Sequence, residues 1–123
     1  MLAKQLVADF CHLCFGQKQP VAAFDRFVAA TLVQHNPGLT DGAEPALASL
    51  EKRLLENPEI NYDIRHIIAD GDMVVVHALV RRDRLDHGRA VVDIFRVRRD
   101  KIVEHWDIVQ PMPEAAANPH PMF

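Results

Sequence analysis

The feature that most constrains the fold is a change in the spacing of apolar residues near position 60. Before it, apolar side chains recur every three to four residues, as on one face of a helix; after it, they alternate with period two. We expect helices at about residues 3–15, 20–33 and 41–57, and strands at residues 61–69, 73–82, 90–98 and 102–109. Helices followed by strands predict an α+β fold, here with an antiparallel sheet of four strands.

Residues that favour helix ends fix these boundaries. Gly16 ends the first helix, and Pro20 stands at a helix start, where proline is tolerated. The segment QHNPG at residues 34–38 breaks the second helix, because the residue before a proline avoids helical geometry. Asp41 and Glu44 have the spacing of an N-cap and capping box for the third helix.

The length and charge of the chain limit its organisation and its partners. A chain of 123 residues suits a single domain, residues 1–123, with a proline-rich C-terminal tail at residues 111–123. We expect the apolar residues at its end, Met122 and Phe123, to dock on the same subunit or on a partner subunit. The net charge is −3 and no Lys/Arg run exceeds two residues, so no nucleic-acid partner is expected. No apolar run could cross a membrane and no signal-peptide pattern opens the chain, so we expect a cytoplasmic protein.

The two cysteines, Cys11 and Cys14, form a C-x-x-C pattern. Such a pair can be redox-active or half of a zinc site, but no further cysteine is present to complete a site. The pair also falls late in its helix, away from the N-terminus that would stabilise a thiolate. We therefore expect both to pack as small hydrophobic residues.

The strand at residues 73–80, MVVVHALV, is apolar on both faces. Three helices can cover one face of the sheet. The other face needs a different cover, and a second copy of the chain, forming a homodimer, is the simplest.

Three stretches give the chain a recognisable pattern: QHNPGL, IIADGDMVVVH and VVDIFRVRRDKIVEHWDIVQP. From the first helix to about Pro111, the sequence resembles the SnoaL-like polyketide cyclase branch of the nuclear transport factor 2-like superfamily. One departure is the turn Arg99-Asp100-Lys101, where the family usually has Asp-Gly-Lys, and we expect it to change only turn geometry.

The resemblance implies a cone-shaped α+β barrel whose curved sheet wraps around helices and encloses a largely apolar pocket. It also implies homodimers through the outer face of the sheet. Activities in the family include ring closure, epoxide opening, isomerisation and dehydration, while other members only bind a ligand or a protein. The fold therefore leaves function open, and the site has to be argued residue by residue.

The most informative polar pair is in VEHWDIV, residues 103–109. On a strand, His105 and Asp107 share a face with Val103 and Val109, which favours a pocket wall over a solvated surface. The resemblance assigns the acid at this point to the pocket, where it commonly acts as acid or base. We therefore expect Asp107→Asn to remove function and to leave the fold intact.

Three further residues are candidate catalytic groups. Asp93 shares a strand face with apolar neighbours, where a carboxylate is costly unless it is paired; a structural ion pair with a nearby arginine is the alternative. His77 lies on an apolar strand face, where a histidine is more often a satisfied core residue than a catalyst. The resemblance matches His35, by its spacing to Pro37, to a position that helps hold a water in epoxide-opening relatives; a turn hydrogen bond is the alternative.

These residues predict a cofactor-independent acid–base enzyme of cyclase, isomerase or hydratase type. Its substrate would be a small apolar carbonyl or epoxide-like molecule, against a wall formed by Tyr62, Phe27, Val75, Phe95 and Val109. A histidine beside a carboxylate can take and return a proton near neutral pH. Neither a phosphate-binding glycine loop nor a local metal-ligand spacing occurs, so no cofactor and no metal are expected. A non-catalytic ligand-binding protein or a structural dimer remains the alternative.

Overall fold

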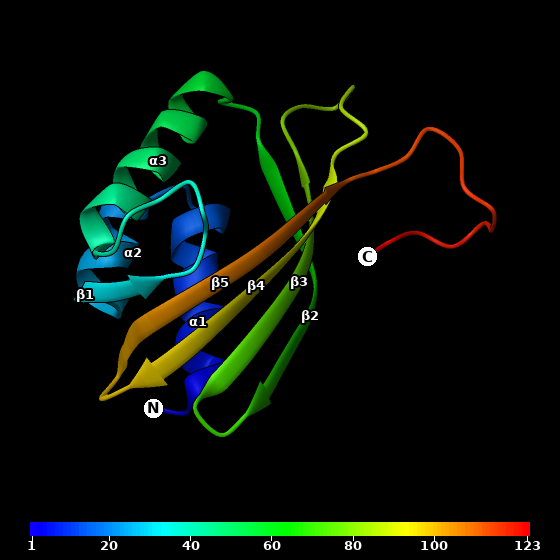
Figure 1. Cartoon of the computed structure of the whole chain (residues 1–123). Coiled ribbons are helices and arrows are strands. Elements are labelled where there is room, and N and C mark those ends of the chain that lie inside the picture. The colour runs from blue at the N-terminus through cyan, green and yellow to red at the C-terminus, as the bar shows by residue number, and fades with distance from the viewer.

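The computed structural model describes residues 1–123 and confirms the α+β class, with three α-helices packed on one face of a five-stranded mixed sheet (Figure 1). The strand order is β1-β5-β4-β3-β2. The elements are α1 (Ala3–Cys11), a π-helical turn η1 (His12–Gly16), α2 (Pro20–Phe27), β1 (Val28–Gln34), α3 (Ala43–Glu56), β2 (Asn61–Asp70), β3 (Met73–Arg81), β4 (Arg89–Arg98) and β5 (Lys101–Pro111). No helix is long and apolar enough to cross a membrane.

The prediction of a long second helix and a four-stranded sheet was wrong. The helix ends at Phe27, and Val28–Gln34 form β1, which pairs parallel to β5. The segment VAATLVQ contains three β-branched residues, which favour a strand over a helix. Edge strand β1 therefore brings the QHNPG segment beside the last strand, whose register pairs Gln34 with His105.

The predicted N-cap of the third helix was also wrong. Helix α3 begins at Ala43, after Gly42, whose positive φ of 103° is a backbone conformation that glycine adopts readily. No side chain caps this helix. The Asp41 carboxylate instead accepts a hydrogen bond of 2.8 Å from the backbone N–H of Gln34. Asp41 thus fixes the end of β1, next to the residues that matter for the site.

The strands β2 to β5 form the predicted meander. Asp70 pairs with Met73 across a two-residue turn that begins at Gly71, as predicted. Arg98 pairs with Lys101 across the two-residue turn at Arg99 and Asp100, both of which have positive φ, at 52° and 59°. Positive φ at both central positions is the type I′ geometry that the family's Asp-Gly pair suits, so the departure in sequence leaves the turn in place but strained.

The core lies between the helices and the inner face of the sheet. Phe10 is at its centre, with edge-to-face contacts to Phe15, Phe24 and Phe95 at ring separations of 5.7–6.0 Å. Sixteen buried hydrophobic residues form one cluster there. Packed aromatic rings of this kind add to the hydrophobic stabilisation of the core.

Both cysteines are free and buried in this core, as predicted. Burial, and to a smaller extent the Asp93 charge, raise the pKa of the Cys14 thiol to about 12. The pKa of Cys11 is raised for the same two reasons. The thiolate needed for redox chemistry or for metal binding is therefore disfavoured.

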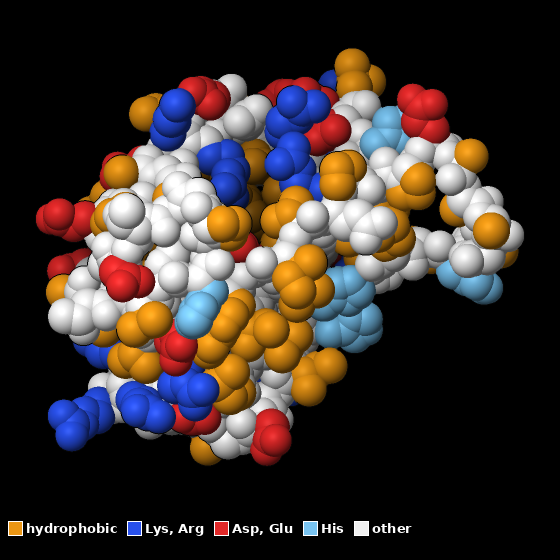
Figure 2. All heavy atoms as spheres, viewed as in Figure 1, with side chains coloured by type: hydrophobic (Ala, Val, Ile, Leu, Met, Phe, Trp, Pro, Cys, Tyr) orange, Lys and Arg blue, Asp and Glu red, His pale blue; other side chains and the backbone are white.

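The outer face of the sheet carries two apolar rows that run across the strands. The register places Ile68, Val75, Ile94 and Trp106 in one row and His66, His77, Val92 and Ile108 in the other. Figure 2 shows hydrophobic side chains gathered on this face. No helix covers it in a single copy of the chain.

The C-terminal tail folds back against the β2 side of this outer face. The Nε2 of His77 donates a 2.8 Å hydrogen bond to the carbonyl of Met122, and the Arg65 guanidinium lies 4.6 Å from the centre of the Phe123 ring. His77 also stacks on His66, with 3.0 Å between their Nδ1 atoms. The tail therefore docks on its own chain, as predicted, and leaves the β4 and β5 part of the face open.

Candidate functional site

A cavity of about 430 Å³ lies between the helices and the inner face of the sheet. Its volume is in the range of sites that bind small molecules. Of the 26 residues that line it, 15 are hydrophobic, and the only carboxylates among them are Asp93 and Asp107. A largely apolar wall with two acids on one strand pair is the arrangement in which acid–base chemistry is expected.

The sheet register places the polar groups of the cavity beside one another. Asp93 on β4 pairs directly with Asp107 on β5, and Phe95 pairs with His105 one row away. The β4–β5 register shifts between Arg96 and Val97, where Val103 of β5 has no partner. This bulge on β5 turns His105 and Asp107 to the same inner face as Asp93 and Phe95. All of these residues except the buried Phe95 are partly exposed to the cavity.

Hydrogen bonds link Asp93, His105 and Gln34 in a chain. The His105 ring contacts Asp93 Oδ1 through Nε2 at 2.8 Å and Gln34 Oε1 through Nδ1 at 2.9 Å. The backbone N–H of Asn36 also donates to Gln34 Oε1, which fixes the amide with its oxygen toward the ring. Both ring nitrogens therefore face acceptors, and the His105–Asp93 pair accommodates a shared proton.

The Gln34 side chain shows that this arrangement has a cost in stability. Its Nε2 is buried and has no hydrogen-bond partner, because the oxygen of the same amide is held by two donors. A buried unpaired donor costs about 1–3 kcal/mol. The fold thus accepts an unpaired amide N–H on Gln34, while the oxygen of the same amide orients the His105 ring.

Asp107 is held in a different way. Asn36 Nδ2 donates to both of its carboxylate oxygens, at 3.0 and 2.9 Å. An amide N–H stabilises the ionised carboxylate but cannot exchange a proton with it at neutral pH. By contrast, Asp93 Oδ2 has no protein hydrogen-bond partner and is not fully buried, so it is open to the cavity.

The same three residues could hold a metal ion. One ligand atom each of Asp93, His105 and Asp107 lies within 4.8 Å of the others. Two carboxylates and one histidine form a ligand set that divalent transition metals accept. A metal would have to displace the bond between His105 and Asp93 and compete with Asn36 for Asp107. The absence of a metal therefore stays a prediction, which elemental analysis of chelator-free protein would test.

Six of the predicted site residues line the cavity. Of these, Tyr62, Phe95 and Val109 contribute to the wall around Asp93, His105 and Asp107. The Phe95 ring lies 5.2 Å from the His105 ring. Tyr62 accepts a 3.2 Å hydrogen bond from Arg53 Nη1, and burial raises the pKa of its hydroxyl, against the opposing effect of Arg53.

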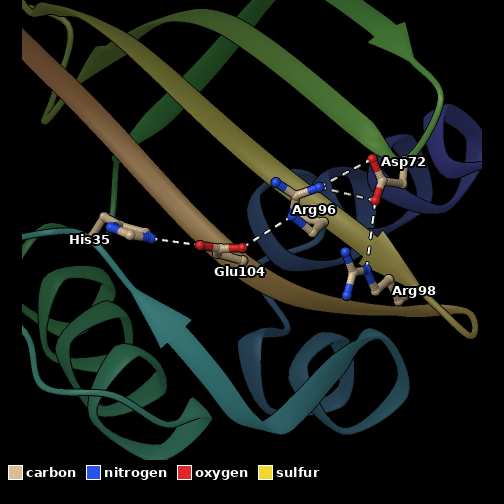
Figure 3. Close-up of polar contacts among 5 residues, drawn as sticks. All are labelled: His35, Asp72, Arg96, Arg98 and Glu104. Carbon is tan, nitrogen blue, oxygen red and sulfur yellow. Dashed lines mark hydrogen bonds and ion pairs between the residues drawn. The ribbon is translucent and has the colours of Figure 1, made fainter.

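His35 does not line the cavity, contrary to prediction. It follows β1 on the outer side of the sheet, where its Nε2 contacts Glu104 at 2.7 Å and its ring stacks on Trp106 at 4.5 Å. Figure 3 shows His35 pointing toward Glu104, which in turn reaches Arg96 and, beyond it, Asp72. The residue before the proline that does face the site is Asn36, one position later.

His77, Val75 and Phe27 are also outside the cavity. The first two alternate with the inward-facing residues of β3 and therefore lie on the outer face, where His77 holds the tail. Phe27 is buried in the core, with 4% of its surface exposed, and packs behind the cavity wall. Val75 and His77 therefore belong to the outer face of the sheet and Phe27 to the core, and none of the three belongs to the site.

Seven polar residues of the cavity were not predicted: Gln34, Asn36, Ser49, Arg53, Asn57, Arg82 and Arg89. The signal for the first two was present in QHNPG. With residues 28–34 assigned to a strand, alternation would place Gln34 and Asn36 on the face opposite to His35. The arginines carried no such signal, because they come from three separate elements.

The match to a known family follows from the sequence itself. The family model described as a SnoaL-like domain matches residues 7–105. The chain belongs to the SnoaL-like domain family. No curated protein matches this SnoaL-like sequence at a significant level.

Solved structures share the fold of this SnoaL-like chain at low sequence identity. IdmH from Streptomyces antibioticus, described as a candidate polyketide cyclase, is 19% identical with a TM-score of 0.74, covering 89% of this chain and 92% of its own. AclR from Streptomyces galilaeus, described as a candidate hydroxylase, is 17% identical with a TM-score of 0.75, covering 90% and 80%. A candidate isomerase of the SnoaL-like family from Agrobacterium tumefaciens is 10% identical with a TM-score of 0.71, covering 89% and 99%. The structural similarity establishes the fold of the SnoaL-like chain, and the low sequence identity leaves its reaction open.

Proposed function

We propose that the protein is a cofactor-independent acid–base enzyme of cyclase, isomerase or hydratase type. Its substrate is a small, mostly apolar molecule with a carbonyl or epoxide-like oxygen. The observation that carries this proposal is the hydrogen-bonded series Asp93–His105–Gln34 in the wall of the cavity. Asp107 lies directly opposite Asp93 on the neighbouring strand. The family match and the enzymes described among the structural neighbours support the same class.

The geometry supports different tasks for the two acids. Asp93 Oδ2 is free to take a proton from a substrate carbon beside a carbonyl, because only Oδ1 is bonded to His105. His105, held by Gln34, stabilises either protonation state of Asp93 through that bond. Asp107, held through both oxygens by Asn36 Nδ2 and close to Asp93 and His105, would orient a substrate hydroxyl or a water. One positioned proton carrier of this kind contributes on the order of a hundred- to ten-thousand-fold in rate.

The test is a turnover screen with matched variants. Purified protein is incubated with carbonyl compounds and epoxides of a size that fits the cavity, and products are identified by mass spectrometry. A hit that depends on Asp93, and that survives substitution of the distant His77, supports the proposal. Turnover that is unchanged in Asp93→Asn would contradict it.

A second candidate function is ligand binding without chemistry. The observation in its favour is that Asp107 and both ring nitrogens of His105 already have protein partners. Such a satisfied wall can orient a ligand without reacting with it. In this case Asp93→Asn would change the affinity for a bound molecule by a modest factor, and no product would form.

The apolar outer face supports the proposal of a homodimer. Ile108 is 66% exposed, and it lies in a row with Val92 that the tail leaves open. Burying such a patch against a second copy removes apolar surface from water. Sedimentation at micromolar concentration should give about twice the 13.9 kDa chain mass, and Ile108→Lys should shift the protein to monomer. A wild-type monomer at that concentration would exclude this interface. A cytoplasmic location stays a prediction from the sequence.

A further inference from the structure

The inner face of the sheet changes character from one end of the cavity to the other. Successive rows across β4 and β5 hold Asp93 with Asp107, then Val91 with Val109, then Arg89 with Pro111. Because strands rise about 3.3 Å per residue, Arg89 begins about 13 Å from Asp93 along β4. The cavity thus has an acid–base end, an apolar middle and a basic end.

Three arginines from three elements meet at the basic end. We call Arg53, Arg82 and Arg89 the arginine rim; all three line the cavity. Arg53 is in the last turn of α3, Arg82 directly follows β3, and Arg89 begins β4. The sheet register brings these ends together, because Val80 pairs with Arg89. Figure 2 shows Lys and Arg side chains on both sides of a recess floored by hydrophobic side chains, near the top of the view.

The arginine rim has few partners within the protein. Arg82 contacts Asp86 at 3.3 Å, which is the only ion pair of the rim. Arg53 donates to the neutral hydroxyl of Tyr62, and Arg89 makes no side-chain hydrogen bond or ion pair. Three guanidinium groups thus share one carboxylate, in a chain whose net charge is −3. Like charges gathered at a cavity mouth are unfavourable unless an anion offsets them, and they attract one.

We propose that the molecule bound in this cavity is an organic anion whose carboxylate lies against the arginine rim. Its apolar body would fill the region of Val91 and Val109, and its reacting oxygen would reach Asp93 at the far end. Guanidinium groups bind carboxylates through paired N–H···O bonds, so the rim also sets the direction in which the molecule enters. The inference rests on the proposed function for the reacting end only; the anion site itself can be tested by binding.

The binding test uses two fluorescent probes that differ by one charged group. 8-Anilinonaphthalene-1-sulfonate is an apolar anion, and N-phenyl-1-naphthylamine has the same rings without the sulfonate. Arg89→Gln removes a rim charge that has no hydrogen bond or ion pair in the protein, and Arg84→Gln, at an exposed position between β3 and β4, is its matched control. Ser49→Trp, on the cavity wall, shows whether each probe enters the cavity.

We expect Arg89→Gln to weaken binding of the anionic probe by about fivefold or more, and Arg53→Gln/Arg89→Gln to weaken it further, as expected for lost charged hydrogen bonds. The neutral probe should change by less than about twofold in these variants, and Arg84→Gln should change neither probe. Ser49→Trp should displace both. Added NaCl should weaken only the anionic probe.

Other results would overturn the inference. Equal losses of both probes in Arg89→Gln, or anion binding that survives Ser49→Trp, would mean that the rim does not select an anion in the cavity. Failure of the proposed function is seen separately, in the turnover screen. Selective anion binding without any turnover would support the anion site and contradict the proposed enzyme function. Turnover of anionic substrates that is indifferent to Arg89→Gln keeps the enzyme and removes the rim.

Discussion

The substitution Asp93→Asn separates a proton carrier from a structural ion pair. In the wild type, Asp93 Oδ1 lies 2.8 Å from His105 Nε2, and these side chains are 23% and 16% exposed. The replacement keeps the size of the side chain, and its Nδ2–H can donate to Nε2 while Nδ1–H of the ring still donates to Gln34. The hydrogen-bond chain survives, but the acid that holds the shared proton is gone.

The expected magnitude follows from that exchange of partners. A hydrogen bond to a charged group contributes about 1.5–3 kcal/mol and a neutral one about 0.5–1.5 kcal/mol. Asp93→Asn should therefore lower the free energy of unfolding by about 1 kcal/mol, or Tm by about 3–6 °C in a chain of this length. Asp93→Ala, which leaves the His105 ring nitrogen unpaired, should cost about 2–4 kcal/mol. Turnover should fall a hundred-fold or more in both.

Urea unfolding and NMR of the His105 ring nitrogens measure these quantities without a known substrate. We expect hydrogen on both ring nitrogens in the wild type when the pair is charged, and on Nδ1 alone in Asp93→Asn. A loss of stability in Asp93→Asn as large as in Asp93→Ala would identify a structural ion pair. If Asp107→Asn abolishes turnover and Asp93→Asn does not, the assignment of the two acids is reversed.

Three further predictions concern the stability and reactivity of the fold. Changing the Arg99-Asp100 turn to Asn-Gly should raise the free energy of unfolding by about 1 kcal/mol, because both positions have positive φ; an unchanged urea midpoint would contradict this. Cys11 and Cys14 should resist iodoacetamide at pH 8 in the folded protein and react in urea, since burial raises both pKa values. The pKa of Glu104 is lowered from its ordinary value of 4.5 by its hydrogen bonds from His35 and then Arg96. The stability it contributes is present above pH 4.5 and is lost as the pH falls through the lowered value. The difference in unfolding free energy between wild type and Glu104→Gln should therefore vanish in acid, and a difference that grows there would refute the account.

Patterns with a single physical cause could be predicted from the sequence. The meander from β2 to β5 follows from period-two alternation, and its first turn follows from Gly71. The burial of Cys11 and Cys14 follows from the apolar stripe of the first helix. In each case the local preference and the global fold agree, so the sequence is sufficient.

β1 could not be predicted in the same way. Its residues, VAATLVQ, continue the apolar spacing of α2, and their local β preference is completed only by pairing with β5, about 70 residues later in the chain. This contact also decides the site, because it carries Gln34 and Asn36 to His105 and Asp107. His35 was predicted from the resemblance, by its spacing to Pro37, and without the strand no alternation indicated that Asn36 is the residue that faces inward.

Simple alternation predicted the inner-face residues of β5 correctly except at its start, where the β4–β5 register shifts opposite Arg96 and Val97. Strict period two places Val103 with His105 and Asp107, yet the buried residue at this end of β5 is Ile102, which is 1% exposed. An unbroken strand that buried Ile102 would turn His105 and Asp107 outward, into the apolar rows of the outer face. The extra residue resolves this conflict: Ile102 stays in the core cluster where it borders the cavity, and His105 and Asp107 also face the cavity. The bulge thus lets one strand pack Ile102 into the core and turn His105 and Asp107 toward the cavity, which an unbroken strand could not do.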